Sequence, residues 1–285
     1  MNIDTIIKEA LDEDIIDPTG KIASGDHSSL SIFGDSKIGF ARLLVKDTGV
    51  LAGVELAKKI FDAVDSSLEV KILLNDGDNI KPGDIVLTVS GNICSLLRAE
   101  RLVLNFMQRM SGIATTTAKY VDAVKGTSCK ILDTRKTTPN LREIEKWSVR
   151  IGGGYNHRFG LYDMIMLKDN HVDFAGGIAN AIINANDYLI KNRINIDIEV
   201  ETRNLNEVKQ VLSIGLVKRI MLDNFKPEDV KIAVELINNR FETEASGGIT
   251  LETIKNYAET GVDYISVGAL THSVKSLDLS FKATI

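Results

Sequence analysis

Positively charged side chains gather in one short stretch of the chain, between Asp133 and His171. The chain as a whole is acidic, with 34 Lys and Arg residues against 39 Asp and Glu residues. A basic cluster inside an acidic protein favours a pocket for a small, highly charged anion over a surface for nucleic acid or membrane. The cluster consists of Arg135, Lys136, Arg142, Lys146, Arg150, His157, Arg158, Lys168 and His171.

Reactive or anion-binding residues also recur at fixed places in the second half of the chain. Six short apolar segments there, CKILDT, DMIMLKD, IDIEVET, KRIMLDN, RFETEASGG and DYISVGA, are expected to be strands separated by helices. At their ends stand Asp133 to Lys136, Lys168 to His171, Glu199 and Glu201, Asp223 and Asn224, Ser246 to Gly248, and Gly268. In a parallel α/β barrel the active site lies where the strands end, so these residues are expected to meet in one site.

The alternation of strands and helices predicts an α/β fold in which helices cover a parallel sheet. We expect a closed or nearly closed barrel, with a doubly wound open sheet as the alternative. No GxGxxG or GxxxxGK[ST] motif follows a strand, which argues against a dinucleotide or P-loop site.

The first hundred residues predict a different, smaller α+β domain. An amphipathic helix is expected from Ile3 to Leu11, followed by strands in FARLLVKD, LEVKILLND and DIVLTVSG. Two helices should follow, one over residues 95–110 and a second after Gly112 that ends at Gly126.

The charged side chains have both functional and structural interpretations. Arg101, Arg135 and Arg158 could each bind a carboxylate or phosphate through two hydrogen bonds, or could lie solvated on the surface. Lys168 follows the apolar MIML segment, so its stem should be buried and its ammonium should pair with an anion. A Schiff-base lysine or a structural ion pair would give the same pattern.

Two acidic residues and two glycine-rich loops could bind the hydroxyl and phosphate groups of a phosphorylated sugar. Glu199 and Glu201 should point to the same side of the sheet, and Glu201 lies nearer the strand end. With Asp223 it could hold ribose hydroxyls or a divalent metal, or form salt bridges with nearby cations. The ASGGI and SVGALTHS segments could bind phosphate through backbone N–H groups, or could be turns without a ligand.

Composition and termini favour a cytoplasmic protein that binds neither nucleic acid nor membrane. The formal net charge is −5, and no apolar run approaches the roughly 20 residues that span a bilayer. The N-terminal segment MNIDTIIKEALDEDI lacks the features of a signal peptide. Cys94 and Cys129 are isolated, which predicts buried thiols in a reducing compartment.

Longer motifs in the same order resemble those of the quinolinate phosphoribosyltransferase family. They are the Glu100-Arg101 pair, DTRKTTP, GGGYNHRFGLYD, KDNH, EVE, LDNF, EASGGI and SVGALTHS. The resemblance implies the type II phosphoribosyltransferase architecture. Residues 1–110, rejoined by the tail 271–285, would form an α/β sandwich domain, and residues 111–270 would form an incomplete α/β barrel of the TIM type.

The resemblance also implies an activity in NAD biosynthesis. The enzyme would transfer phosphoribosyl from phosphoribosyl pyrophosphate to the nitrogen of quinolinate, releasing pyrophosphate and CO2 and leaving nicotinate mononucleotide. The catalytic residues would be Lys136, Lys168, Glu201 and Asp223. Mg²⁺ would be held by Glu201 and Asp223, partly through the substrate.

The family's binding residues carry over to matching positions of this chain. Quinolinate would be bound by Arg101, Arg135, His157, Arg158 and Lys168. Phosphoribosyl pyrophosphate would be bound by Lys136, Glu201, Asp223, Ser246, Gly247, Gly248 and Gly268. The resemblance implies a homodimer or a multiple of dimers, in which Arg101 reaches the neighbouring subunit's site.

Three other functions fit parts of the pattern. A paralogue related to molybdenum-transport accessory proteins would keep the phosphate and ribose residues but accept another base. A Schiff-base lyase would use Lys168 as its nucleophile. A non-catalytic phosphometabolite-binding protein would need neither the acidic pair nor the full set of cations.

Overall fold

The computed structural model describes residues 2–33 and 37–284. The chain forms two compact units, the first made of Met1–Ala118, Thr137–Gly153 and Thr271–Ile285, and the second of Lys119–Lys136 and Gly154–Leu270. No helix within the described ranges is both long enough and apolar enough to cross a membrane.

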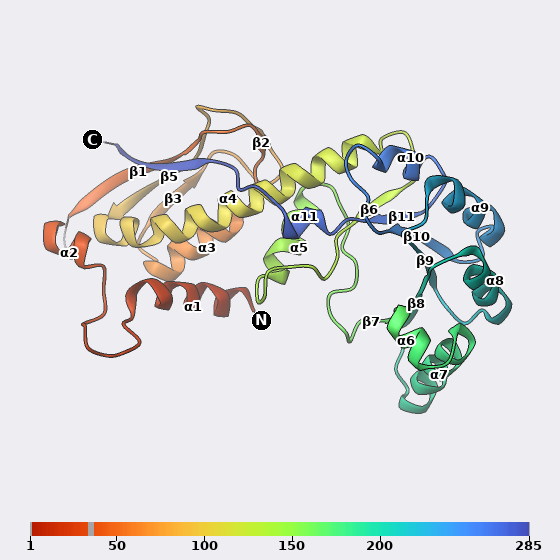
Figure 1. Ribbon diagram of the computed structural model, residues 1–285. Helices are drawn as coiled ribbons and strands as arrows, with labels where there is room; N and C mark the ends of the chain where they lie inside the picture. The colour runs from red at the N-terminus through yellow and green to blue at the C-terminus, as the bar shows by residue number, and fades with distance from the viewer. Residues whose placement is uncertain (1, 34–36, 285) are drawn as a thin grey trace. The chain divides into compact units, whose positions relative to one another are not determined.

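The first unit is built on an antiparallel sheet of four strands in the order β12-β1-β5-β3. Its strands are β1 (Ile38–Val45), β3 (Glu69–Ile72), β5 (Ile85–Asn92) and β12 (Leu279–Thr284), with β2 (Gly49–Val50) and β4 (Asn79–Ile80) as a separate short pair. Its helices are α1 (Ile3–Ile15), α2 (His27–Phe33), α3 (Val54–Val64), α5 (Arg142–Ile151) and most of α4 (Ile93–Ala123). Figure 1 shows α3 and α4 on the same side of this sheet.

Alternation along β1 explains how this unit forms its core. Ala41, Leu43 and Val45 are buried on one face of the strand and join a cluster that includes Phe61 of α3 and Met107 of α4. The C-terminal strand β12 pairs along β1, so the end of the chain completes the sheet that the N-terminal region begins.

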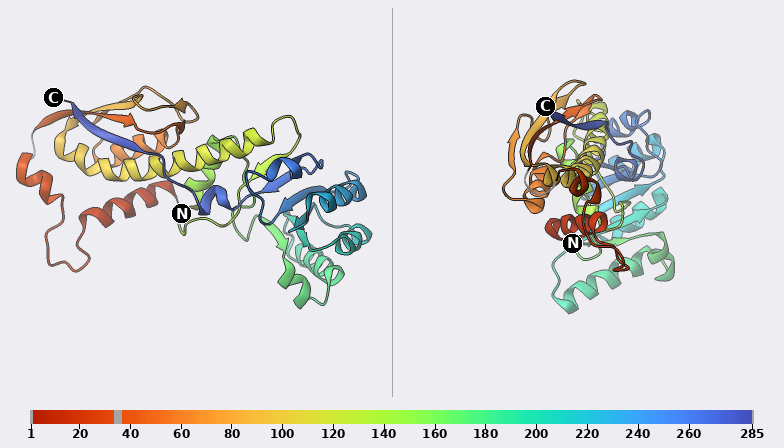
Figure 2. Two further views of the ribbon diagram at one scale, coloured as in Figure 1. Left: turned by 45° about the horizontal axis from the view of Figure 1, so that its top comes forward. Right: turned by 90° about the vertical axis from the view of Figure 1, so that its left-hand side faces the viewer.

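The second unit contains six strands, all parallel, in the order β6-β11-β10-β9-β8-β7. They are β6 (Lys130–Leu132), β7 (Met164–Leu167), β8 (Asp197–Thr202), β9 (Arg219–Asp223), β10 (Glu242–Ser246) and β11 (Tyr264–Ser266). The helices that follow strands are α6 (Asp169–Phe174), α7 (Ile178–Asn192), α8 (Leu205–Ile214), α9 (Pro227–Ile237), α10 (Ile254–Ala258) and α11 (Ala269–His272). Helices α7 to α10 stand side by side along one face of the sheet, as Figures 1 and 2 show.

These features confirm the predicted α/β class and the incomplete barrel. β6 and β7 lie at opposite ends of the strand order in the described part of the chain, so the sheet does not close. A doubly wound sheet would carry helices on both faces, whereas this sheet carries its row of helices on one.

The prediction of two helices on either side of Gly112 is wrong. α4 runs without a break from Ile93 to Ala123. Gly112 lies inside it because the chain at Lys275 packs closely there, and a Cβ atom on residue 112 would overlap the Lys275 carbonyl oxygen. The glycine therefore allows a close backbone approach, and it does not end a helix.

The compact units differ from the predicted domain limits at α4 and α5. The predicted limit at residue 110 falls inside α4, and the units divide this helix after Ala118. Met110 and Ala114 of α4, and Ile144 of α5, belong to the core of the first unit. Packing therefore assigns more of the middle of the chain to the first unit than the motifs suggested.

Candidate active site

Polar side chains of the second unit stand in register on neighbouring strands. Residues paired across neighbouring parallel strands point to the same face of the sheet, and so do residues two apart on one strand. The side chains of three successive rows of paired residues therefore point to the same face. The pairings Glu199–Arg219–Glu242, Glu201–Met221–Glu244 and Asp223–Ser246 define these rows. Barrel interiors of this type are commonly filled by branched apolar residues, so rows of charged residues indicate a specialised interior.

Lysines and carboxylates form the first group in this unit. Lys168 Nζ lies 3.8 Å from Oε2 of Glu201, which is only 8% exposed. Burial and the Asp223 carboxylate raise the pKa of Glu201, and burial also raises the pKa of Asp223. The positive charges of Lys168 and Lys136 act on Asp223 in the opposite direction. The structure thus brings together the four residues predicted to be catalytic.

Asp169 adds a further negative charge to this group. It follows Lys168 directly, begins α6, and contributes to the raised pKa values of both Glu201 and Asp223. Burial disfavours the ionised form of both carboxylates, and a bound cation would offset that cost.

Two arginines form the second group. Burial and the nearby Arg135 guanidinium lower the pKa of Arg158. Arg158 Nη1 donates a hydrogen bond to the carbonyl oxygen of Met164, 3.1 Å away. The Nε atom of Arg135 is buried and has no hydrogen-bond partner among the described residues. Two guanidinium groups that repel each other, one with an unsatisfied donor, fit an anion with more than one negative charge.

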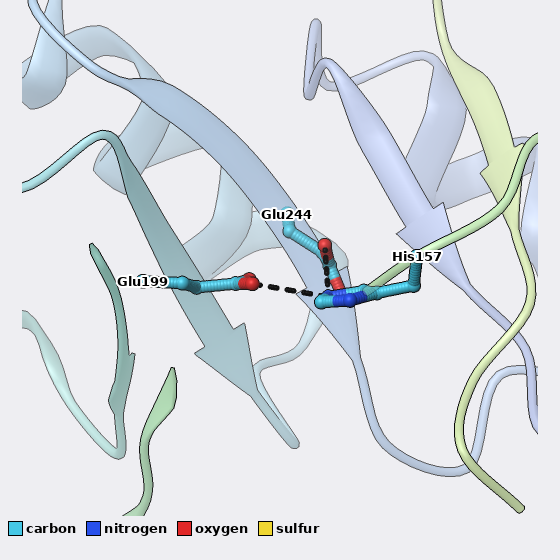
Figure 3. Close-up of side chains that lie close together, drawn as sticks. All are labelled: His157, Glu199 and Glu244. Atoms are coloured by element: carbon cyan, nitrogen blue, oxygen red, sulfur yellow. Dashed lines mark ion pairs between the residues drawn. The ribbon is translucent and has the colours of Figure 1, made fainter. Parts of the chain in front are cut away.

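His157 reaches from the loop before β7 to two buried glutamates, as Figure 3 shows. Its Nε2 atom lies 3.0 Å from Oε2 of Glu199 and 3.3 Å from Oε2 of Glu244, and both glutamates are fully buried. Its backbone N–H donates to Asp133 Oδ1 at 2.9 Å, which fixes the loop at the end of β6. The ring therefore connects the loop to strands β8 and β10.

The two ring nitrogens of His157 have different surroundings. Burial disfavours the charged ring, but the Glu199 and Glu244 carboxylates outweigh burial and raise the pKa of His157 to about 9. The backbone N–H of Arg158 donates to Nδ1 at 2.6 Å, which opposes a proton on that nitrogen. Geometry thus assigns a proton to Nε2, between the carboxylates, and places the Arg158 amide against the other side of the ring.

The glycine-rich loop after β10 is shaped by its neighbour on β9. Gly247 has a φ of 93°, and a Cβ atom there would overlap the Asn224 side chain. Ser246 Oγ accepts a hydrogen bond from Ser266 Oγ at 2.9 Å. Gly248 also has positive φ, and Gly268 lies two residues beyond the end of β11. The loop exposes backbone where a phosphate could approach.

The basic residues between Asp133 and His171 are divided between the two units. Arg142, Lys146 and Arg150 lie on α5 in the first unit, whereas Arg135, Lys136, His157, Arg158 and Lys168 belong to the second. His171 accepts a hydrogen bond at Nδ1 from the Lys168 backbone N–H, 3.0 Å away, as part of the cap of α6. Arg101 is exposed on α4 in the first unit.

Glu244 and Arg219 were not among the predicted site residues. Arg219 Nη1 lies 3.0 Å from Oε2 of Glu244, and its guanidinium lies over the Tyr264 ring. Strand parity could have identified Glu244, since it stands two residues before Ser246 in RFETEASGG and so shares its face. Asp169 was visible in the KDNH motif but had received no role.

Comparisons with known proteins agree with this arrangement. The sequence model of the quinolinate phosphoribosyl transferase C-terminal domain matches residues 113–282, and that of the N-terminal domain matches residues 26–111. The chain belongs to the quinolinate phosphoribosyltransferase family. Both matches together cover the residues of every group described above.

Individual relatives support the same assignment. A quinolinate phosphoribosyltransferase [decarboxylating] 2b, mitochondrial, of Nicotiana tabacum is 50% identical over 256 residues, covering 85% of this chain and 72% of the relative. A probable nicotinate-nucleotide pyrophosphorylase [carboxylating] of Bacillus subtilis is 44% identical, covering 93% and 90%. The crystal structure of NadC from Streptococcus pyogenes superposes with a TM-score of 0.91 at 42% identity, covering 99% of this chain and 96% of that one.

Proposed function

We propose that this chain transfers phosphoribosyl from phosphoribosyl pyrophosphate to the ring nitrogen of quinolinate. The products are nicotinate mononucleotide, pyrophosphate and CO2, which makes the reaction a step of NAD biosynthesis. Family membership supports this proposal. The observation that carries it is the partly buried pair Arg135 and Arg158, whose mutual repulsion and unsatisfied Nε suit a dicarboxylate.

The quinolinate subsite consists of these two arginines and Lys168. Arg135 and Arg158 offer planar donor pairs that match carboxylates, and Lys168 offers a point charge beside Glu201. His157 holds the loop that carries Arg158. The partner subunit's Arg101 completes the subsite in a homodimer or a multiple of dimers, consistent with its exposure on α4.

The phosphoribosyl pyrophosphate subsite consists of the acidic pair, Lys136 and the glycine loops. Glu201 and Asp223 accept hydrogen bonds from ribose hydroxyls, and Lys136 offsets the charge of the phosphates. The backbone of Ser246, Gly247, Gly248 and Gly268 offers N–H donors to the terminal phosphate.

The acidic pair also fits Mg²⁺. Glu201 and Asp223 are oxygen donors on the neighbouring strands β8 and β9, and Mg²⁺ is commonly bound by one or two carboxylates plus substrate phosphates. Bound together with the pyrophosphate group, Mg²⁺ supplies charge neutralisation to the leaving group. Lys136 and Lys168 add to that neutralisation from the protein side.

The chemistry of the substrate sets the order of events. As the ribosyl C1 loses pyrophosphate it becomes cation-like, and the Glu201 and Asp223 carboxylates favour that charge. The pyridine nitrogen then bonds to C1, which gives the ring a positive charge. Only that charged ring can accept the electron pair left by the departing C2 carboxylate, so transfer precedes loss of CO2. The C2 carbanion then takes a proton from water, which completes nicotinate mononucleotide.

The arginines bind the substrate dianion, but tight pairing with the C2 carboxylate would oppose its departure. The negative charge of that group disappears in the transition state, so a strong ion pair with it would stabilise the ground state more. We therefore expect the carboxylate that remains in the product to be paired more tightly than the one that departs.

A direct assay tests the proposal. The purified protein is incubated with quinolinate, phosphoribosyl pyrophosphate and Mg²⁺, and nicotinate mononucleotide and released CO2 are measured. Absence of both products from folded protein would overturn the proposed function. Better turnover of nicotinate than of quinolinate would show that the reaction is not decarboxylating. Borohydride trapping of Lys168 on a carbonyl substrate would instead favour the lyase.

We also propose a cytoplasmic location. Cys94 and Cys129 are both free and buried, which confirms the predicted thiols and suits a reducing compartment. The plant relatives carry the words mitochondrial or chloroplastic in their names, so fractionation of the source cells is the test. Recovery in a membrane-bounded organelle would overturn this location.

A further inference from the structure

We infer that Glu244 is a positioning residue for quinolinate, acting through His157 to fix the loop that carries Arg158. This inference deepens the proposed function and depends on it for its substrate. Glu244 lies on β10, whereas His157 and Arg158 lie on the loop before β7, so the contact joins opposite sides of the open barrel.

The geometry of the ring contacts supports this role. Glu244 Oε2 lies 3.3 Å from His157 Nε2, and Glu199 Oε2 lies 3.0 Å from the same atom. Both carboxylates lie within ion-pair distance of this one nitrogen, so they hold the ring between β8 and β10. The opposite nitrogen of that ring, Nδ1, accepts the Arg158 backbone N–H at 2.6 Å. Movement of the ring would therefore move the backbone of Arg158.

Burial makes these contacts costly to lose. Glu199 and Glu244 are fully buried, and His157 is 7% exposed, so water cannot readily replace a missing partner. Glu244 Oε2 also pairs with Arg219 Nη1, 3.0 Å away, and this second contact helps to hold the carboxylate in place. Arg219 offsets part of the negative charge of the two glutamates, and the Nε2 proton of His157 lies beside the same two carboxylates.

The same three side chains could in principle ligate a metal, since their donor atoms lie within 4.8 Å of one another. The Arg158 amide occupies the lone pair of Nδ1, so the ring proton lies on Nε2, and a protonated nitrogen has no lone pair for a metal. Nε2 and the Glu199 oxygen, 3.0 Å apart, form a direct ion-pair contact. A positioning role accounts for all of the contacts, and it extends to Arg158, which a metal site would not explain.

Glu244→Gln tests the inference in the full-length protein, and Glu242→Gln is the matched control. Glu242 lies on the same face of β10 as Glu244 and also pairs with Arg219. Its second partner is Lys218, whereas the second partner of Glu244 is His157. We expect Glu244→Gln to raise KM for quinolinate about tenfold, as loss of an outer-shell partner typically does, with KM for phosphoribosyl pyrophosphate changed less than about twofold. Glu242→Gln should leave both KM values within about twofold.

A double-mutant cycle distinguishes action through His157 from a general effect on the barrel. In a His157→Gln background, adding Glu244→Gln should change KM for quinolinate by less than about twofold, because the connection is already broken. Independent, multiplying effects would overturn the inference, and so would equal effects of the Glu242 and Glu244 variants. If Glu244→Gln does not fold, Glu244→Asp, which withdraws the carboxylate but keeps its charge, should raise KM for quinolinate in the same selective way.

The outcomes separate this inference from the proposed function. Failure of the unmodified protein to turn over quinolinate would count against the function. Normal turnover with an unchanged KM in folded Glu244→Gln would count against the positioning role alone. Stoichiometric metal in the purified protein, lost in Glu244→Gln, would also overturn it by showing that the cluster is a metal site.

Discussion

Lys168 Nζ lies 3.8 Å from Oε2 of Glu201, and this pair joins a side chain that is 51% exposed to one that is almost fully buried. The lysine can therefore be removed without leaving a cavity, while its charge acts on the interior of the barrel. A substitution of Lys168 should therefore test its role in activity without unfolding the protein.

Lys168→Ala should lower kcat by about 10²–10³ with little change in unfolding temperature, since it removes a charge aimed at the leaving group. Steady-state kinetics and calorimetry measure the two quantities. Lys191→Ala, an exposed lysine in the last turn of α7, is the control and should retain full activity. An active Lys168→Ala protein would remove this residue from the catalytic set.

Glu201→Gln should abolish activity but stabilise the fold at neutral pH. Burial and Asp223 raise the pKa of Glu201 above its ordinary 4.5, so the folded state binds more protons than the unfolded state, and the carboxylate destabilises the fold once ionised. We expect the unfolding temperature at pH 7 to rise by about 2 °C. The gain in unfolding temperature should shrink as the pH falls through the raised pKa of Glu201, and it should be lost near the ordinary pKa of 4.5. A variant less stable at pH 7 would contradict the assigned repulsion.

Arg158→Lys should raise KM for quinolinate by about tenfold or more and leave KM for phosphoribosyl pyrophosphate nearly unchanged. Lysine keeps the charge but cannot form the paired hydrogen bonds of a guanidinium, and it loses the bond to the Met164 carbonyl. Arg193→Lys, at the exposed C-cap of α7, provides the control. Equal changes in the two KM values would indicate disturbed folding of the site and no role in quinolinate binding.

Mixing inactive Arg101→Ala and Arg135→Ala proteins should restore about a quarter of full activity if the sites are shared between subunits. With random exchange, half of the dimers contain one copy of each, and one of their two sites is then intact. Native mass spectrometry confirms the exchange. Complete inactivity of confirmed mixed dimers would place Arg101 in the site of its own subunit, or outside the site altogether.

Gly247→Ala should destabilise the protein by about 1–3 kcal/mol, because the residue has a φ of 93° and a side chain would meet Asn224. Gly248→Ala is the matched control. Its φ is 62°, and nothing lies within 4 Å of the position of a Cβ atom, so its cost should stay near 1 kcal/mol. Chemical unfolding measures both. Equal losses would show that the Asn224 contact contributes nothing.

The sequence predicted the barrel strands well because each one combines an apolar run with a polar end. DMIMLKD and KRIMLDN became β7 and β9, with Lys168 and Asp223 where their positions in those segments placed them. The helix break at Gly112 could not be judged in the same way. A glycine is needed there because the backbone at Lys275, more than 160 positions later in the chain, packs against it. Local residue spacing cannot predict such a contact.

The site itself was predicted in part, for a related reason. Motifs identified residues that a substrate would touch, such as Arg135 and Glu201. They did not identify Glu244, whose role depends on His157 crossing from another part of the barrel. Contact between a loop and a strand far away in the sequence is set by the tertiary structure. Strand parity alone shows only which face of the sheet Glu244 occupies.

The open side of the barrel has a consequence for how this fold could be altered. The backbone of Tyr155 forms a bridge to Leu132 of β6, and the Arg158 side chain donates a hydrogen bond to the Met164 carbonyl of β7, so one loop contacts both edge strands of the sheet. Exposed edges are sites of unwanted association between chains. We therefore expect this loop to limit association between chains at these edges, and shortening it should lower solubility together with affinity for quinolinate.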